Sequence, residues 1–254
     1  VGSFGPVSVS GGSFVDATGD PGGTVMIRGG RIVIDGSTIA TGTLGDTDPA
    51  ATVGVDIRGQ EQVVLSGAAV VQTVAAAGGR GGDVLIGAGS GPADGSVQLS
   101  GGSLVLSQTA GRGRGGDVSL TAGLVGVDDA GIATVSSGAG PGFEGVGGDV
   151  TLKGSTDTLT NGAFIQSVNQ NSTLEGRGGI FTVWGTDSVT SSGQNASAVF
   201  SSIVSTTGPA GDGGRIEPDV LDHLRSCYDA ATISFPWQEG ELLMLGNMMG
   251  AHGR

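Results

Sequence analysis

Three aspartates share one position in successive copies of a glycine-rich motif. Asp83, Asp117 and Asp149 each follow a Gly-Gly pair and precede a valine, in copies written GGDVLIG, GGDVSLT and GGDVTLK. If the copies stack like neighbouring β-strands, about 4.8 Å apart, these carboxylates form a column and repel one another unless something compensates. Calcium prefers such oxygen ligands, and Gly78–Asp83 spells the calcium-repeat pattern Gly-Gly-x-Gly-x-Asp once. The column is therefore a candidate calcium site.

The residues just before the Gly-Gly pairs offer an explanation of the same column without a metal. Arg80, Arg114 and Arg177 each stand directly ahead of such a pair. In this alternative, each aspartate accepts backbone N–H bonds at its turn and the arginines neutralise its charge. The sequence leaves both explanations open, and calcium is the single cofactor under consideration.

The sequence offers little for catalysis. Solenoid enzymes that cleave polysaccharides need converging carboxylates together with Lys, Arg or His. The glycine-rich part of the chain holds one lysine, Lys153, and no histidine, because His223 and His252 both lie near the C-terminus. We therefore expect no enzymatic activity, and a polysaccharide lyase or hydrolase is the alternative.

Gly-Gly pairs recur along the chain and set its period. The first glycine of each pair falls at 22, 81, 115, 147, 178 and 213, and the first interval divides near residue 54, which gives repeats of about 27–35 residues. Each repeat holds three short stretches that alternate apolar and other residues, which is the period of a half-buried β-strand. A β-sandwich also has short strands, but its strands have no reason to repeat the same residues. We predict an all-β fold, a three-faced parallel β-helix of about seven coils over residues 1–216, with Val84, Val118 and Val150 in one column.

The last 38 residues, 217–254, differ in composition from the repeats and contain Cys227, both histidines and three of the four methionines. Pro218 followed by DVLDHLRSCYDAA predicts a helix around 218–231 with proline in its first turn. A short helical cap would cover the last apolar layer of the solenoid. A non-native tail, or self-association through this segment, are the alternatives.

Charge and composition exclude several classes of protein. The 254 residues carry a formal net charge of −13, which repels phosphate backbones and anionic membranes, so we expect no nucleic-acid partner. The single cysteine permits no internal disulfide, and no apolar run approaches the roughly 18 residues of a membrane span. Because Val1 falls inside the established pattern, we expect a segment of a longer protein.

The repeats resemble those of filamentous-haemagglutinin-like exoproteins. The resemblance lies in GGDVLIGAG, GGDVSLTAGLVGV and GGDVTLKGSTDTLTNGAFIQS. Gly147–Ser167 matches all three strands of the family's repeat and Gly101–Ser107 matches the middle one, within a resemblance that covers about residues 5–215. The Asn-Pro-Asn-type motifs of the family's secretion domain do not occur here, which leaves the secretion route open or places the signal upstream.

This resemblance implies a right-handed parallel β-helix that is secreted through an outer-membrane barrel partner. It also implies adhesion at a bacterial surface. We therefore expect a structural or binding segment of a secreted surface adhesin, located outside the cell or on its surface. Its ligand would be a glycan or a host or cell-surface protein, bound by loops near 43–52, 87–95, 136–146 and 185–198.

Outward side chains of the repeats suggest a further alternative. Rows of hydroxyls order water in ice-binding solenoids, and four residues here fit such rows: Ser119, Thr121, Thr151 and Thr182. Lys153, Arg28 and Trp184 interrupt these rows, which disfavours ice binding. Trp184 itself is expected to pack in the wall of the solenoid rather than to serve as a sugar platform.

Overall fold

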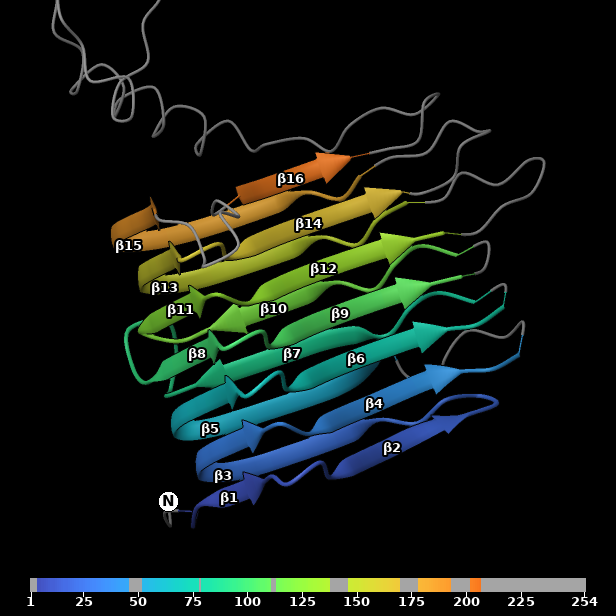
Figure 1. The fold of residues 1–254 in the computed structure, drawn as a ribbon, viewed down its shortest axis with the longest axis horizontal. Helices are drawn as coiled ribbons and strands as arrows, with labels where there is room; N and C mark the ends of the chain where they lie inside the picture. Colours follow the sequence, from blue (N-terminus) through green and yellow to red (C-terminus); the bar gives the residue numbers. More distant parts are fainter. Residues whose placement is uncertain are drawn as a thin grey trace, which may run out of the picture.

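The computed structural model describes residues 4–45, 52–77, 79–110, 113–137, 146–169, 178–192 and 202–206. These residues form sixteen strands and no helix. Every strand pairing among them is parallel. Figure 1 shows the strands stacked in successive layers. The predicted all-β class and parallel β-solenoid are confirmed.

The strands fall on three sides of the solenoid. The first side is formed by β3 (Val25–Asp35), β5 (Val53–Ser66), β7 (Asp83–Ala88), β10 (Val118–Thr121), β13 (Val150–Thr160) and β15 (Phe181–Ser192). The second side holds β1 (Val7–Val9), β8 (Ser96–Ser100) and β11 (Leu124–Asp128), together with the later halves of β3, β5, β13 and β15. The third side is formed by β2 (Phe14–Gly19), β4 (Thr38–Thr43), β6 (Val70–Ala75), β9 (Leu104–Thr109), β12 (Gly131–Ser136), β14 (Phe164–Asn169) and β16 (Ser202–Thr206).

The solenoid has about five turns, fewer than the seven predicted. These turns begin at β3, β5, β7, β10 and β13, and each places a strand on all three sides. β1 and β2 supply two sides of a partial turn before them, and β15 and β16 follow them. The sequence count also included a repeat from Gly178, which corresponds to β15 and β16, and a repeat from Gly213, which lies outside the described residues.

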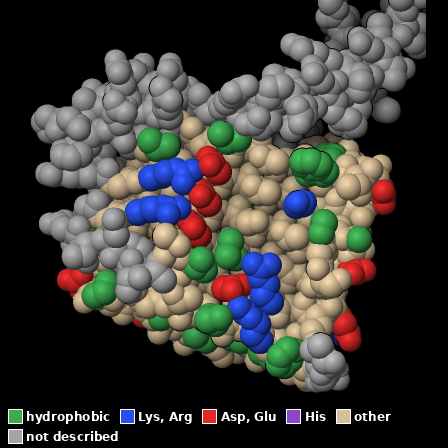
Figure 2. All heavy atoms as spheres, turned by 180° about the vertical axis from the view of Figure 1, so that it is seen from behind, with side chains coloured by type: hydrophobic (Ala, Val, Ile, Leu, Met, Phe, Trp, Pro, Cys, Tyr) green, Lys and Arg blue, Asp and Glu red, His purple; other side chains and the backbone are tan. Residues whose placement is uncertain are grey.

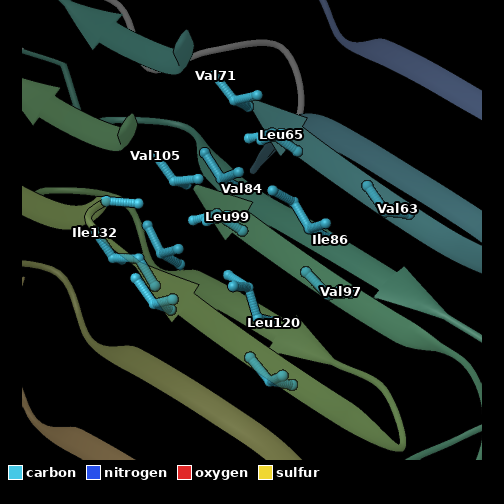
Figure 3. Close-up of a cluster of buried hydrophobic side chains, with 14 of the residues drawn as sticks. Val63, Leu65, Val71, Val84, Ile86, Val97, Leu99, Val105, Leu120 and Ile132 are labelled. Carbon is cyan, nitrogen blue, oxygen red and sulfur yellow. The ribbon is translucent and has the colours of Figure 1, made fainter. Parts of the chain in front are cut away.

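Apolar columns fill the interior, as the repeat predicted. On the first side, Val84 pairs in register with Val118, and Val118 with Val150. All three are buried, and a column of Ile86, Leu120 and Leu152 runs beside them. Figure 3 shows such side chains from several strands meeting in the middle. At about 1.5–3 kcal/mol for each fully buried aliphatic side chain, these columns are the main source of stability.

The Gly-Gly pairs lie at a corner where successive coils touch and where buried hydroxyl groups bind the backbone. Thr73 and Ser107, buried on neighbouring strands of the third side, both donate hydroxyl hydrogen bonds to the carbonyl of Gly82, at 2.5 and 3.0 Å. A Cβ on Gly148 would collide with the carbonyl oxygen of Gly116 in the coil below. Because this corner brings the backbones of successive coils into direct contact, it accepts glycine alone.

The C-terminal segment 217–254, with its predicted helix and cap, lies outside the described residues. The described strands, Val7–Thr206, all fall within the predicted solenoid domain of residues 1–216. Among the described residues, no helix has the length and apolar character to cross a membrane.

Candidate functional site

The three predicted aspartates stand side by side at the start of the first side. The backbone N–H of Asp117 donates to Oδ1 of Asp83 at 2.8 Å, and that of Asp149 donates to Oδ1 of Asp117 at 2.8 Å. The N–H of Ile180 completes the series on Asp149 at 2.7 Å. Each carboxylate therefore binds the backbone of the next coil, which fixes the register of the stack.

Two arginines pair with the three carboxylates of this column and offset part of their negative charge. Arg80 pairs with Asp83 at 2.7 Å and reaches Asp117 at 3.4 Å, while Arg114 pairs with Asp117 at 2.8 Å and Asp149 at 2.7 Å. In Figure 2 they form two blue bars beside a red column. We call these five residues the Arg–Asp ladder. The expected pairing of these aspartates with arginines is present for Arg80 and Arg114, although the backbone N–H donors belong to the next coil and not to each aspartate's own turn. Arg177 lies outside the described residues.

The environment of the ladder shifts two pKa values. Burial raises the pKa of Asp83, although the Asp117 N–H and the Arg80 charge oppose that shift. Burial disfavours the charge of Arg114, but its bonds to Asp117 and Asp149 outweigh burial and raise the pKa. The ladder therefore behaves as a coupled ionic network that joins three coils.

The ladder does not resemble a metal centre. Within the described residues there is no group of three or more His, Cys, Asp and Glu placed to hold a metal ion. The guanidinium groups already supply the positive charge that calcium would bring. Calcium binding at Asp83, Asp117 and Asp149 stays a prediction, which calorimetric titration and a calcium-dependent melting temperature would test.

A second outward column on the first side gathers cations. In register across six strands stand Arg28, Arg58, Gly87, Thr121, Lys153 and Trp184. We call it the cationic column. Asp56 lies between its first two members, pairing with Arg28 at 2.5 Å and with Nε of Arg58 at 2.9 Å. The sequence analysis treated Lys153, Arg28 and Trp184 as interruptions of hydroxyl rows and did not group them, although their shared position in the repeat was a usable signal.

Trp184 differs from its prediction. Its side chain is 55% exposed, so it is not packed in the wall. The Lys153 ammonium lies 5.7 Å from the centroid of the indole ring, within the range of a cation–π interaction. The two residues are in register on β13 and β15. They form an aromatic and cationic platform on the outer surface.

The surface between the two columns is polar and small-chained on β10, β13 and β15, whereas Leu85, Asp56 and Met26 hold the same position on the three earlier strands. Ser119, Thr151 and Thr182 follow one another in register there, on β10, β13 and β15. Figure 2 shows this area as a pale field between the Arg–Asp ladder and the remaining cations. It provides hydroxyl groups for hydrogen bonding to a ligand that lies across the strands.

The structure contains a buried carboxylate, Asp157, that the sequence analysis did not identify. Asp157 on β13 is 0% exposed, and neither of its oxygens has a hydrogen-bond partner among the described residues. It pairs in register with Val125 and Val189, at a place where other coils carry aliphatic residues. Burial raises the pKa of this carboxyl to about 7. An alignment of the second-side strands of the repeats would have shown this acid at a position that is aliphatic in the neighbouring coils.

Comparison with known proteins finds short similarity. No family model matches the sequence. No solved structure matches the chain. A stretch of 44 residues, 17% of this chain, is 41% identical to the dapdiamide synthesis protein DdaC of Enterobacter agglomerans. This stretch covers 13% of that protein, and so short a match assigns no family.

Proposed function

We propose that the chain is a non-enzymatic binding segment of a secreted bacterial surface adhesin. The interior columns are committed to stacking, so binding falls to outward side chains. The observation that carries the proposal is the first side of the solenoid, where the Lys153–Trp184 platform and a field of hydroxyls are held in fixed register. Exposed aromatic and cationic groups beside half-buried hydroxyl groups suit a glycan.

The adhesin role locates the protein at the cell surface or outside the cell. Passage through an outer-membrane barrel partner, and a glycan or cell-surface protein as the ligand, belong to the same proposal. Of the predicted binding loops, the one near 87–95 is described and forms a loop at Gly89–Gly95, directly after β7. The loop predicted near 185–198 is wrong for residues 185–192, which belong to strand β15. Most of the loops near 43–52 and 136–146 lies outside the described residues. The proposal therefore moves the binding surface from the loops to the flat first side.

Attachment of coated beads tests this function. Beads that carry the full chain are expected to attach to bacterial or epithelial surfaces, and to glycan-coated slides, more than beads that carry the Val118→Asp variant. That substitution puts an unpaired charge into an apolar column and unfolds the coil around it. Equal attachment of both beads would refute the proposal. So would cleavage of acidic or neutral polysaccharides that is lost on replacing one specific Asp or Glu.

A further inference from the structure

We propose that the cationic column binds an acidic polysaccharide, a chain of uronic acids laid along the stack of coils and across the strands. This inference rests on the proposed function and names its ligand class.

The charge distribution favours an anionic ligand at this column. The described ranges hold six Lys and Arg residues, and three of them, Arg28, Arg58 and Lys153, belong to the column, although the whole chain carries −13. Asp56 offsets one of these charges. The column is therefore a local site of positive charge on an acidic protein, which attracts an anion by focusing the local field.

Two of these cations have donors available. Arg58 donates its Nε to Asp56, and among the described residues its two Nη atoms have no hydrogen-bond acceptor. Its Nη1 lies over Gly87, since a Cβ there would come within 2.6 Å of that atom. The Lys153 side chain is exposed, and within the described part of the chain its ammonium pairs with no carboxylate. A guanidinium fork and an ammonium are thus free to bind ligand carboxylates.

The spacing of these groups suits an extended chain. Arg58 and Lys153 lie three strand positions apart in one column, which is about 14 Å at the usual strand spacing. Gly87 and Thr121 fill the positions between them and leave the surface low. Trp184 follows Lys153 with its ring half exposed, where it can stack on the apolar face of a sugar. In a uronic acid chain, carboxylates at intervals along the ribbon of sugar rings match the cations Arg58 and Lys153, and a ring face matches Trp184.

The surroundings disfavour a nucleic acid. The Arg–Asp ladder at the start of the same strands carries three carboxylates against two guanidinium groups. A densely charged phosphate backbone would be repelled by this acidic neighbour and by the overall charge of −13. Duplex DNA carries one charge per about 1.7 Å of its axis, whereas a uronic acid chain carries at most one charge per sugar, on rings with apolar faces for Trp184. The column therefore favours a polyanion of low charge density.

Isothermal titration calorimetry of the full chain with oligogalacturonate tests the inference. We expect binding that weakens with added salt and that is lost with the methyl-esterified oligosaccharide, which has the same rings without the charge. Lys153→Gln, Arg58→Gln and Trp184→Ala should each weaken binding about tenfold, as expected for one charge-assisted hydrogen bond or stacking contact. Arg31→Gln, an exposed cation at the start of the second side, is the matched control and should bind like the parent.

Three results would overturn the inference. They are equal binding of the methyl ester, equal loss of affinity in Arg31→Gln, and tighter binding of a DNA oligonucleotide of the same total charge. Circular dichroism melts of each variant show that a loss of affinity is not a loss of fold. Attachment of coated beads without oligogalacturonate binding would refute this inference and leave the adhesin proposal standing, whereas the reverse result would refute the adhesin proposal alone.

Discussion

At the scale of single residues, carboxylates on the first side and in the core differ in whether they have partners. The Arg–Asp ladder gives each partly exposed carboxylate a guanidinium and a backbone N–H. Asp157, in contrast, is buried without a partner among the described residues. A buried group of this kind favours its neutral form, since an isolated charge in an apolar interior is costly.

Asp157 should make the fold less stable as pH rises. Its pKa is raised from 3.8 to about 7 in the folded chain, so the unfolded chain loses this proton first. Its contribution is therefore fully present below about pH 4 and is lost as pH rises through about 7, by about 4 kcal/mol in total. Chemical denaturation of the parent and of Asp157→Val across pH 4–8 measures the difference.

We expect Asp157→Val to gain stability over the parent progressively between pH 4 and 7, with no further change above that range. Asp157→Asn, which keeps the shape without titrating, is the matched control and should follow the pH dependence of the valine variant. Parallel curves for the parent and both variants would show that the carboxyl does not titrate in this range.

Arg114 should contribute modestly to stability because its ion pairs are partly exposed. Replacing it with alanine leaves Asp117 and Asp149 without their shared cation, and we expect a loss of about 1 kcal/mol in free energy of unfolding at low salt. The loss should shrink as salt is added. Arg31→Ala, with no ion pair among the described residues, should change the unfolding free energy by less. A larger loss for Arg31→Ala than for Arg114→Ala would contradict the role given to the ladder.

At the scale of the strands and corners, the Gly-Gly pairs are a steric requirement. The second glycine of a pair lies against the carbonyl oxygen of the same glycine one coil below, as Gly116 does on Gly82 and Gly148 on Gly116. Buried hydroxyls of the third side hold these corners from within, as Thr134 does by donating to Gly148 at 2.7 Å. The corner and the third side therefore form one packed unit.

Gly148→Ala should destabilise the chain much more than Gly126→Ala. A Cβ at residue 148 collides with a backbone carbonyl that cannot move without shifting a coil, which we expect to cost about 3 kcal/mol or more. At residue 126, on β11, a Cβ would meet ordinary contacts, the nearest at 3.5 Å from Thr158 Oγ1. Urea denaturation of both variants measures the contrast, and similar losses would show that the corner is not the constraint.

Much of this arrangement was predictable from strand periodicity. Alternation with a period of two residues identified the inward positions Val84, Val118 and Val150, and the shared Gly-Gly-Asp pattern placed the three aspartates in one column. Trp184 was misjudged because alternation shows which side a residue faces but not how far the neighbouring coils cover it. Asp157 was not identified because the other repeats carry an aliphatic residue at this position.

At the scale of the whole molecule, parallel stacking produces a regular outer surface from an irregular sequence. Each coil adds one residue to every outward column, so residues about 30 positions apart in the chain become neighbours, as Lys153 and Trp184 do. Loop lengths vary between repeats without disturbing this order, because variation is confined to the corners. The longer Gly89–Gly95 loop even contacts another coil, because its Pro92 carbonyl accepts a hydrogen bond from the Ser155 hydroxyl of β13.

The central claim, that successive repeats lie in register one above another, is tested most directly by a cross-link between outward positions. With Cys227 replaced by serine, Ser119→Cys and Thr151→Cys place two thiols on paired residues of β10 and β13, at a separation that suits a disulfide. We predict rapid intramolecular disulfide formation in this pair. The control pair Ser119→Cys and Thr182→Cys, two coils apart, should form none. Failure of the first pair to cross-link in the folded chain, or equal cross-linking of both pairs, would contradict the stacked solenoid.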